Sequence, residues 1–128
     1  MKKYLLVTII AIGVVLSARF YESENVFSYS QVVRQMGYDV SENPYEVTEF
    51  TIPEEFNDVY INYNRLQKEG GYDLSSYKGK KCIRYTYLIP SVNARANIIV
   101  CDGKIIGGDI CGITLDGIMI PIKNEDKS

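Results

Sequence analysis

Two hydrophobic periodicities organise this chain, and the clearer one is the period of two over residues 81–89. The sequence there is KCIRYTYLI, so the odd-numbered residues from Ile83 to Ile89 are apolar or aromatic and the even-numbered residues are mixed. Alternation that is rich in β-branched and aromatic side chains is typical of a strand with one face in a core. We therefore expect a strand over these nine residues.

A second strand pair is predicted downstream, around the dipeptide Asp102-Gly103. Apolar runs flank it on both sides, ARANIIVC before and KIIGGDI after. Asp-Gly between such runs predicts a type I′ hairpin, because both central residues of that turn need positive φ. This turn would place Val100 opposite Ile105 and Ile98 opposite Gly107.

The loop 90–93 sets the pairing of the first two strands. If Ile89 faces Ala94, large side chains oppose small ones on one face, which suits a packed layer. The predicted pairs on that face are Tyr87 with Ala96, Tyr85 with Ile98 and Ile83 with Val100. The pairs on the other, mixed face are Arg84 with Ile99, Thr86 with Asn97 and Leu88 with Arg95.

The helical period appears over residues 54–69. Its apolar positions recur every three or four residues, at Phe56, Val59, Tyr60, Tyr63 and Leu66. Thr51 and Glu54 match a capping box at its start, and a pair of glycines follows its end. We expect this helix to lie across the sheet face formed by Ile83, Tyr85, Ile98, Val100 and Ile105.

Shorter elements complete the predicted domain. A short helix over residues 29–36 would begin at a capping box formed by Ser28 and Gln31. Residues 44–52 read as an edge strand, because they begin with proline and carry two glutamates. Residues 118–122 are predicted to form a last strand, and Leu74 and Tyr77 to hold the connection 72–79 against the core.

The amino-terminal stretch is different in kind. Residues 4–18 contain no charged side chain and follow Lys2 and Lys3. Such a run is an export signal or a membrane anchor, and the lysines orient it with the rest of the chain outside. We expect a single-pass protein of the cell membrane, and the alternative is secretion after cleavage near Ala18.

These elements predict an α+β fold. It has an antiparallel sheet of four or five strands, one long helix packed across one face and an amino-terminal hydrophobic helix. The expected organisation is a signal or anchor over residues 1–21, a linker over 22–27, a single extracytoplasmic domain over 28–123 and a charged tail over 124–128.

Composition narrows the chemistry. The chain has no histidine, the commonest general base and metal ligand, and it shows no catalytic constellation, cofactor motif or metal-ligand spacing. Fourteen basic and sixteen acidic residues give a net charge of −2, which does not favour nucleic-acid binding. We expect a protein that is not an enzyme and needs no cofactor.

The three cysteines leave two interpretations open. The predicted register sets Cys82 opposite Cys101, where a cross-strand disulfide would form outside the membrane. It would close a loop of about 20 residues and contribute about 3 kcal/mol. The alternative is that Cys82, Cys101 and Cys111 are small buried hydrophobic residues.

Eleven tyrosines are more than a core of this size needs. Tyr60, Tyr63, Tyr85 and Tyr87 fit a core lining. Exposed tyrosines suit recognition surfaces, and the candidates for such a surface are Tyr29, Tyr38, Tyr45, Tyr72 and Tyr77. Gly107 and Gly108 predict a place where a backbone or a ring, supplied by Tyr60, Tyr63 or Tyr87, approaches the sheet closely.

Several segments together resemble one protein family. GYDLSSYKGKKCIRYTY, VNARANIIVCDGKIIGGDI, LDGIMI and the upstream TIPEEFNDVYINYNRLQKEGG are similar to the bacterial domain of unknown function 4830. The resemblance covers about residues 31–122. It implies a hydrophobic segment before one small domain, and it implies no activity and no catalytic residue.

The expected function is therefore that of a membrane-anchored, extracytoplasmic binding or accessory domain. Its partner would be a protein, a peptide or an envelope component, and the edge strand near residues 45–51 offers a route for strand addition. The alternatives are a small envelope-acting enzyme that uses carboxylates, which needs two acids about 5–9 Å apart, and a purely structural accessory subunit with a large apolar patch.

Overall fold

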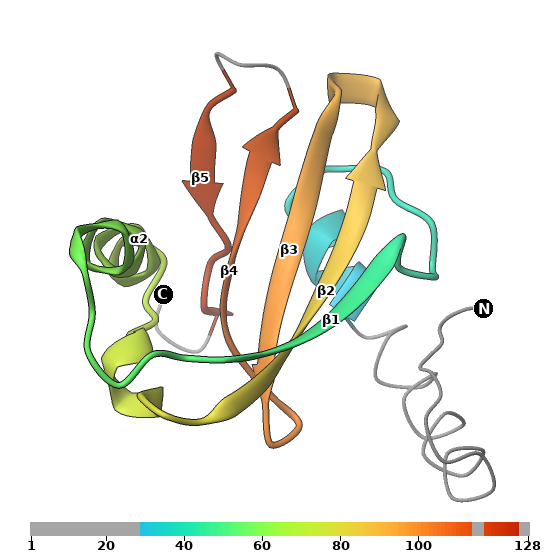
Figure 1. Ribbon diagram of the computed structural model, residues 1–128. Coiled ribbons are helices and arrows are strands. Elements are labelled where there is room, and N and C mark those ends of the chain that lie inside the picture. Colours follow the sequence, from blue (N-terminus) through green and yellow to red (C-terminus); the bar gives the residue numbers. More distant parts are fainter. Residues whose placement is uncertain (1–28, 114–116, 126–128) are drawn as a thin grey trace, which may run out of the picture.

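The computed structural model of the 128-residue chain describes residues 29–113 and 117–125 (Figure 1). A helical segment over residues 29–35 comes first. The later elements are β1 (Glu46–Thr51), α2 (Asp58–Glu69), the 3-10 turn η1 (Leu74–Tyr77), β2 (Lys81–Ile89), the 3-10 turn η2 (Pro90–Val92), β3 (Ala94–Cys101), β4 (Lys104–Gly112) and β5 (Met119–Pro121).

The five strands form one antiparallel sheet in the order β1-β2-β3-β4-β5. Each strand pairs with the next one along the chain, so the sheet is a meander. The predicted α+β architecture is confirmed at this level, with five strands and two helices among the described residues. The prediction that residues 44–52 form an edge strand is also confirmed by β1. Strand β5 lies within residues 118–122, where the last strand was predicted.

The β2–β3 pairing agrees with the sequence prediction at every position. Ile89 pairs with Ala94 and Tyr85 with Ile98, while Thr86 pairs with Asn97 on the opposite face. At the β3–β4 turn, Asp102 has φ 53° and Gly103 has φ 76°, as a type I′ hairpin requires. The alternation of side chains and the turn chemistry therefore determine the centre of the sheet.

The β3–β4 register differs from the prediction after two pairs. Val100 pairs with Ile105 as expected, but Ile98 pairs with Gly108 rather than with Gly107. A β-bulge between Ile99 and Val100 puts one extra residue into β4. With a regular ladder Asp109 would oppose Ala96 in the apolar layer, whereas with the bulge it pairs with Asn97 on the other face.

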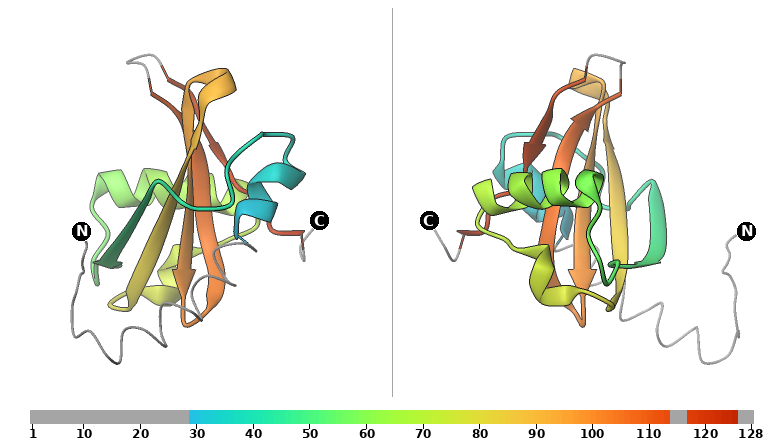
Figure 2. Two further views of the ribbon diagram at one scale, coloured as in Figure 1. Left: turned by 90° about the vertical axis from the view of Figure 1, so that its right-hand side faces the viewer. Right: turned by 60° about the vertical axis from the view of Figure 1, so that its left-hand side comes forward.

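The two helices cover opposite faces of the sheet, as the two views in Figure 2 show. The first face carries Tyr85, Tyr87 and Ile98, and it packs against Tyr29 and Val33 of the 29–35 helix. The second face carries residues such as Cys82, Ile99, Cys101 and Ile106, which pack with Ile52 and Leu74.

The predicted place of the long helix is therefore wrong. Helix α2 crosses the second face (Figure 2), where Tyr63 packs beside the Leu74 cluster, while Ile98 and Val100 point away from it. The short helix already occupies the first face. Helix α2 is also shorter than expected, with twelve residues in place of the sixteen of 54–69.

The start of α2 explains its shorter length. The expected capping box at Thr51 and Glu54 does not form, because the chain stays extended there: the Ile52 N–H donates to the Lys80 carbonyl oxygen at 2.9 Å. The helix begins after Asn57, whose side-chain oxygen accepts from the Tyr60 N–H at 2.9 Å. Gly70 ends the helix, as predicted.

The buried side of α2 is polar. Its two buried residues are Asn64 and Gln67, whereas Val59, expected in the apolar stripe, is 71% exposed. The predicted stripe is therefore right at Tyr63, which faces the sheet, and wrong at Val59.

The amino-terminal predictions concern residues outside the described ranges. These are the apolar run 4–18, the linker 22–27 and the capping box at Ser28. Within residues 29–113 and 117–125, no helix combines the length and the apolar character needed to cross a bilayer.

Candidate binding cleft between helix α2 and the sheet

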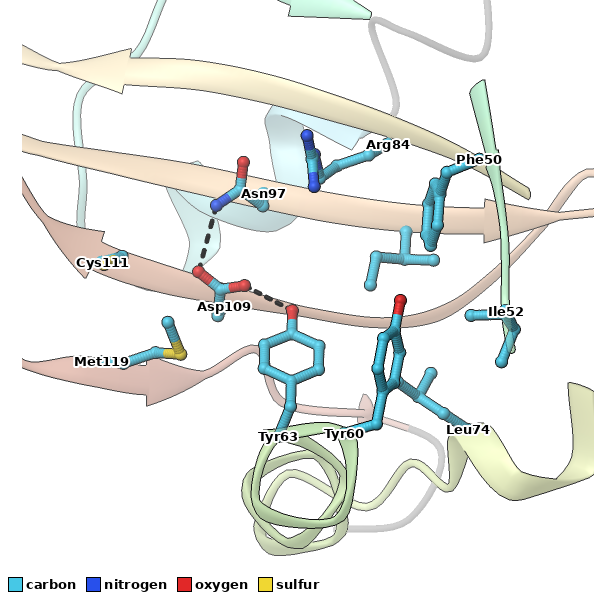
Figure 3. A pocket seen from close by; sticks show the side chains of 11 residues that line it. Phe50, Ile52, Tyr60, Tyr63, Leu74, Arg84, Asn97, Asp109, Cys111 and Met119 are labelled. Atoms are coloured by element: carbon cyan, nitrogen blue, oxygen red, sulfur yellow. Dashed lines mark hydrogen bonds between the residues drawn. The ribbon is translucent and has the colours of Figure 1, made fainter. Parts of the chain in front are cut away.

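A cleft of about 240 Å³ lies between α2 and the second face of the sheet (Figure 3). All five strands contribute to its wall, and Tyr60 and Tyr63 extend into it from the helix. The lining residues are Phe50, Ile52, Tyr60, Tyr63, Leu74, Arg84, Asn97, Ile99, Asp109, Cys111 and Met119. Rings and aliphatic groups therefore surround a small polar centre.

The polar centre is a row of hydrogen bonds that crosses three strands. The Thr86 hydroxyl on β2 donates to Asn97 Oδ1 on β3 at 2.7 Å, and Asn97 Nδ2 donates to Asp109 Oδ1 on β4 at 3.1 Å. The Tyr63 hydroxyl of α2 completes the row by donating to Asp109 Oδ2 at 2.5 Å (Figure 3). Both oxygens of the Asp109 carboxyl thus have an internal donor.

Burial has the largest effect on the pKa values of Asp109 and Tyr63. Asp109 is only 3% exposed, and desolvation raises the pKa of its carboxyl, although the bonds from Tyr63 and Asn97 and the Arg84 charge oppose that rise. Burial, followed by the charge of Asp109, raises the pKa of Tyr63, so its hydroxyl remains a donor. The carboxyl thus serves as an acceptor for donors of its own chain.

Arg84 is the basic group of the cleft. Its charge lowers the pKa of both Asp109 and Tyr63, and its guanidinium lies 5.9 Å from the centre of the Phe50 ring. Its Nε atom is buried, and it has no hydrogen-bond partner among the described residues. A buried donor without a partner is costly, so this nitrogen is a candidate contact for a ligand.

The cleft opens into a second hollow of about 390 Å³ along the same face. The two hollows share Arg84, Asn97 and Cys111, so they are contiguous. The second hollow adds Thr86 to the floor, and Glu46 and Arg95 to the wall. Together the two hollows form one groove, which runs from beneath α2 to the open part of the sheet.

Helix α2 is held beside the groove by its contact with Gly107 and Gly108 of β4. Gln67 is fully buried, and its Oε1 accepts from the Gly108 N–H at 2.8 Å. A Cβ on Gly107 would lie 2.7 Å from that same oxygen, and one on Gly108 would overlap the Asn97 carbonyl oxygen. The predicted close approach does occur, but a glutamine amide rather than a tyrosine ring makes it.

The candidate disulfide residues lie together on the second face. Cys82 and Cys101 are 1% and 3% exposed, both are free thiols, and they directly follow the last β2–β3 pair, Ile83 with Val100, in one buried cluster. Burial, with a smaller effect of the Cys101 thiol, raises the pKa of Cys82 to about 12. The Cys82 thiol thus remains protonated at neutral pH, and both cysteines pack in the same cluster as Ile99 and Ile106.

The candidate recognition tyrosines do not gather on one surface. Tyr45 is 62% exposed beside β1, with the Arg95 guanidinium 5.9 Å from its ring centre. Tyr72 and Tyr77 share one hollow near the end of α2, and Tyr38 lines another beside β4 and β5. Tyr29 is 5% exposed and belongs to the first-face core, so it is not available for recognition.

The cleft residues themselves were missed as a site by the sequence interpretation. A signal was present, since Thr86, Asn97 and Asp109 each interrupt an apolar strand. The Thr86–Asn97 pair was already predicted on the mixed face. Asp109 could join that row only through the bulge, which the Gly107-Gly108 pair inside the strand could have signalled.

The described residues offer no candidate metal site. Nowhere in residues 29–113 and 117–125 do three or more histidine, cysteine, aspartate or glutamate side chains gather as a bound ion would require. The groove instead combines the guanidinium groups of Arg84 and Arg95, amide and hydroxyl groups, and aromatic walls. Such a mixture can bind and orient a small ligand or a side chain.

Comparison with known proteins gives a family. No curated protein and no solved structure was found to match the chain. One family model matches residues 32–110, which include the second half of the 29–35 helix, all of α2, β1 to β3, most of β4 and every cleft residue except Cys111 and Met119. The chain therefore belongs to the family described as Domain of unknown function (DUF4830).

Proposed function

We propose that this protein is a binding module of the cell envelope, which takes its partner in the groove beside α2. The observation that carries the proposal is the composition of the cleft. Apolar walls surround a few convergent polar groups, and the buried Arg84 Nε has no partner among the described residues. Small-ligand and side-chain sites are typically concave, mostly apolar and oriented by a few polar contacts.

The composition of the cleft favours a binding function over an enzyme that hydrolyses its substrate with paired carboxylates. That chemistry needs two carboxyl groups about 5–9.5 Å apart. Asp109 is the single carboxyl among the described residues that line the cleft, and both of its oxygens already accept internal hydrogen bonds. The alternative of a small envelope-acting enzyme thus has less support than binding.

The proposed location is the outer side of the cell membrane. Its support is the uncharged run 4–18 behind two lysines, which orients the chain with its carboxyl-terminal domain outside. A protein or peptide partner would then reach the groove, or add a strand to β1, whose only ladder within the described residues is with β2. Release after signal cleavage is the alternative topology.

A structural accessory role is a second candidate. Val92 and Ile118 are 53% and 76% exposed, and they line one hollow at the end of the sheet that carries η2. Exposed apolar groups of this kind mark contact surfaces when they form a contiguous patch.

Photo-cross-linking on the full-length chain in membranes tests the proposal. A photoreactive residue replaces Met119, which lies in the cleft wall and is 41% exposed. The control replaces Val59, which is 71% exposed and does not line the cleft. We expect a discrete adduct from position 119 that Arg84→Gln weakens, and none from position 59. Equal adducts at both positions would count against the groove as the binding site.

A further inference from the structure

The lining of the groove beside α2 changes from apolar at its inner end to polar at its outer end. Its inner end, beneath the helix, is lined by rings and aliphatic groups, including Phe50, Tyr60 and Leu74. Its outer end is lined by Arg84 and Arg95 with Thr86 and Asn97 between them. A ligand that fills the whole groove would therefore need an apolar part and a polar part.

The charges at the outer end favour an anion. Arg84 and Arg95 contribute two guanidinium groups, whereas the acidic groups are Glu46 at the exposed wall and Asp109, whose oxygens are taken by Tyr63 and Asn97. Guanidinium groups bind carboxylates and phosphates through paired, charge-assisted hydrogen bonds. The open donor at Arg84 Nε lies where the two hollows meet.

We infer that the groove takes a ligand with an oxyanion, a carboxylate or a phosphate, bound by Arg84, and with an apolar portion between Phe50 and Tyr60. The inference rests on the proposed binding function and specifies its ligand class. The inner cleft of about 240 Å³ is smaller than the usual site of a drug-sized ligand, so it fits a single ring or a short chain.

Four small probes and the full-length protein in nanodiscs test this inference by ligand-detected NMR. Phenylacetate and phenyl phosphate carry the two oxyanions on the same ring, phenylacetamide is the neutral match of the acid, and acetate lacks the ring. We expect the two aromatic anions to bind and the other two probes to bind at least about tenfold more weakly.

The variant Arg84→Gln should weaken the binding of the aromatic anions by about tenfold to a hundredfold. The matched control Arg65→Gln should not, because Arg65 is exposed on α2 and does not line the groove. A preference for phenylacetate points to a carboxylate source such as a peptide side chain. A preference for phenyl phosphate points to a phosphorylated envelope component or a lipid headgroup.

Two results would overturn the inference. One is phenylacetamide binding as tightly as phenylacetate, and the other is Arg84→Gln leaving both anions unaffected. If the Met119 adduct still forms in either case, the binding function stands and only the ligand class is wrong. If none of the probes binds and no adduct forms, the proposed function fails as well.

Discussion

Replacing Gln67 with alanine tests how α2 is attached to the sheet. The substitution leaves the buried Gly108 N–H, now bonded to Gln67 Oε1 at 2.8 Å, without an acceptor. An unpaired buried donor costs about 1–3 kcal/mol, and the lost methylene group adds about 0.8 kcal/mol. Removal of the buried Gln67 Nε2, which has no partner among the described residues, offsets part of this cost. We expect a net loss of about 2 kcal/mol.

The assay is denaturant unfolding of the full-length chain, followed by near-ultraviolet circular dichroism of its tyrosines. Gln35→Ala is the matched control, because Gln35 is an exposed glutamine in the 29–35 helix. It should change the free energy of unfolding by less than about 0.5 kcal/mol. Gln67→Met keeps most of the volume, so it isolates the cost of the lost hydrogen bond.

Hydrogen exchange gives a second, local measurement. The Gly108 amide should exchange faster in Gln67→Ala than in the native chain, since its acceptor is gone. The reasoning is refuted if Gln67→Ala and Gln35→Ala have equal unfolding free energies and Gly108 exchange does not change. Helix α2 would then be held by contacts other than this amide.

Four further results are expected. Gly108→Ala should lower the free energy of unfolding by about 3 kcal/mol or more in thermal melts, because the new Cβ would overlap a backbone oxygen. Ile98→Ala should cost about 2–5 kcal/mol in the same melts, since Ile98 is fully buried. Because burial raises the pKa of Asp109, its carboxyl destabilises the fold increasingly as pH rises from about 3.8 through the folded pKa; denaturation of Asp109→Asn at several pH values should lack this decline. Mass spectrometry of the unreduced protein should find free thiols at Cys82 and Cys101, as in the structure, and a disulfide between them would contradict the buried-thiol interpretation.

The sequence predicted the centre of the sheet well, for reasons that can be stated residue by residue. In β2, apolar and mixed side chains alternate without interruption, and a short loop follows, so a slip by one residue would expose Tyr85 and Tyr87. Asp102-Gly103 then allows little other than a tight turn. Local chemistry and the global arrangement agree in this region.

The position of α2 could not be predicted, because the hydrophobic stripe does not determine it. Val59 belongs to the stripe yet is exposed, whereas Gln67 does not belong to it yet is fully buried. The contact of α2 with the sheet depends on Gly107 and Gly108, about forty residues later, which leave space for the side chain of Gln67. A periodicity computed over the helix alone contains no information about that space.

The candidate site was missed for a related reason. Its polar residues come from three strands and one helix, and each is unremarkable in its own segment. Asp109 was interpreted as one residue of a glycine-containing strand, and Tyr63 as part of the core lining. Their 2.5 Å contact arises only after the strands and α2 have packed together.

The bulge in β4 makes the groove sensitive to the number of residues as well as to their types. A chain lacking Ile106 would keep Asp109, Asn97 and Tyr63, yet its regular ladder would aim the carboxyl at Ala96, inside the apolar layer. Deletions at this point should therefore abolish folding even though no polar residue is lost. Relatives that contain every groove residue but differ in length between the Asp102-Gly103 turn and Asp109 would not be expected to share the groove.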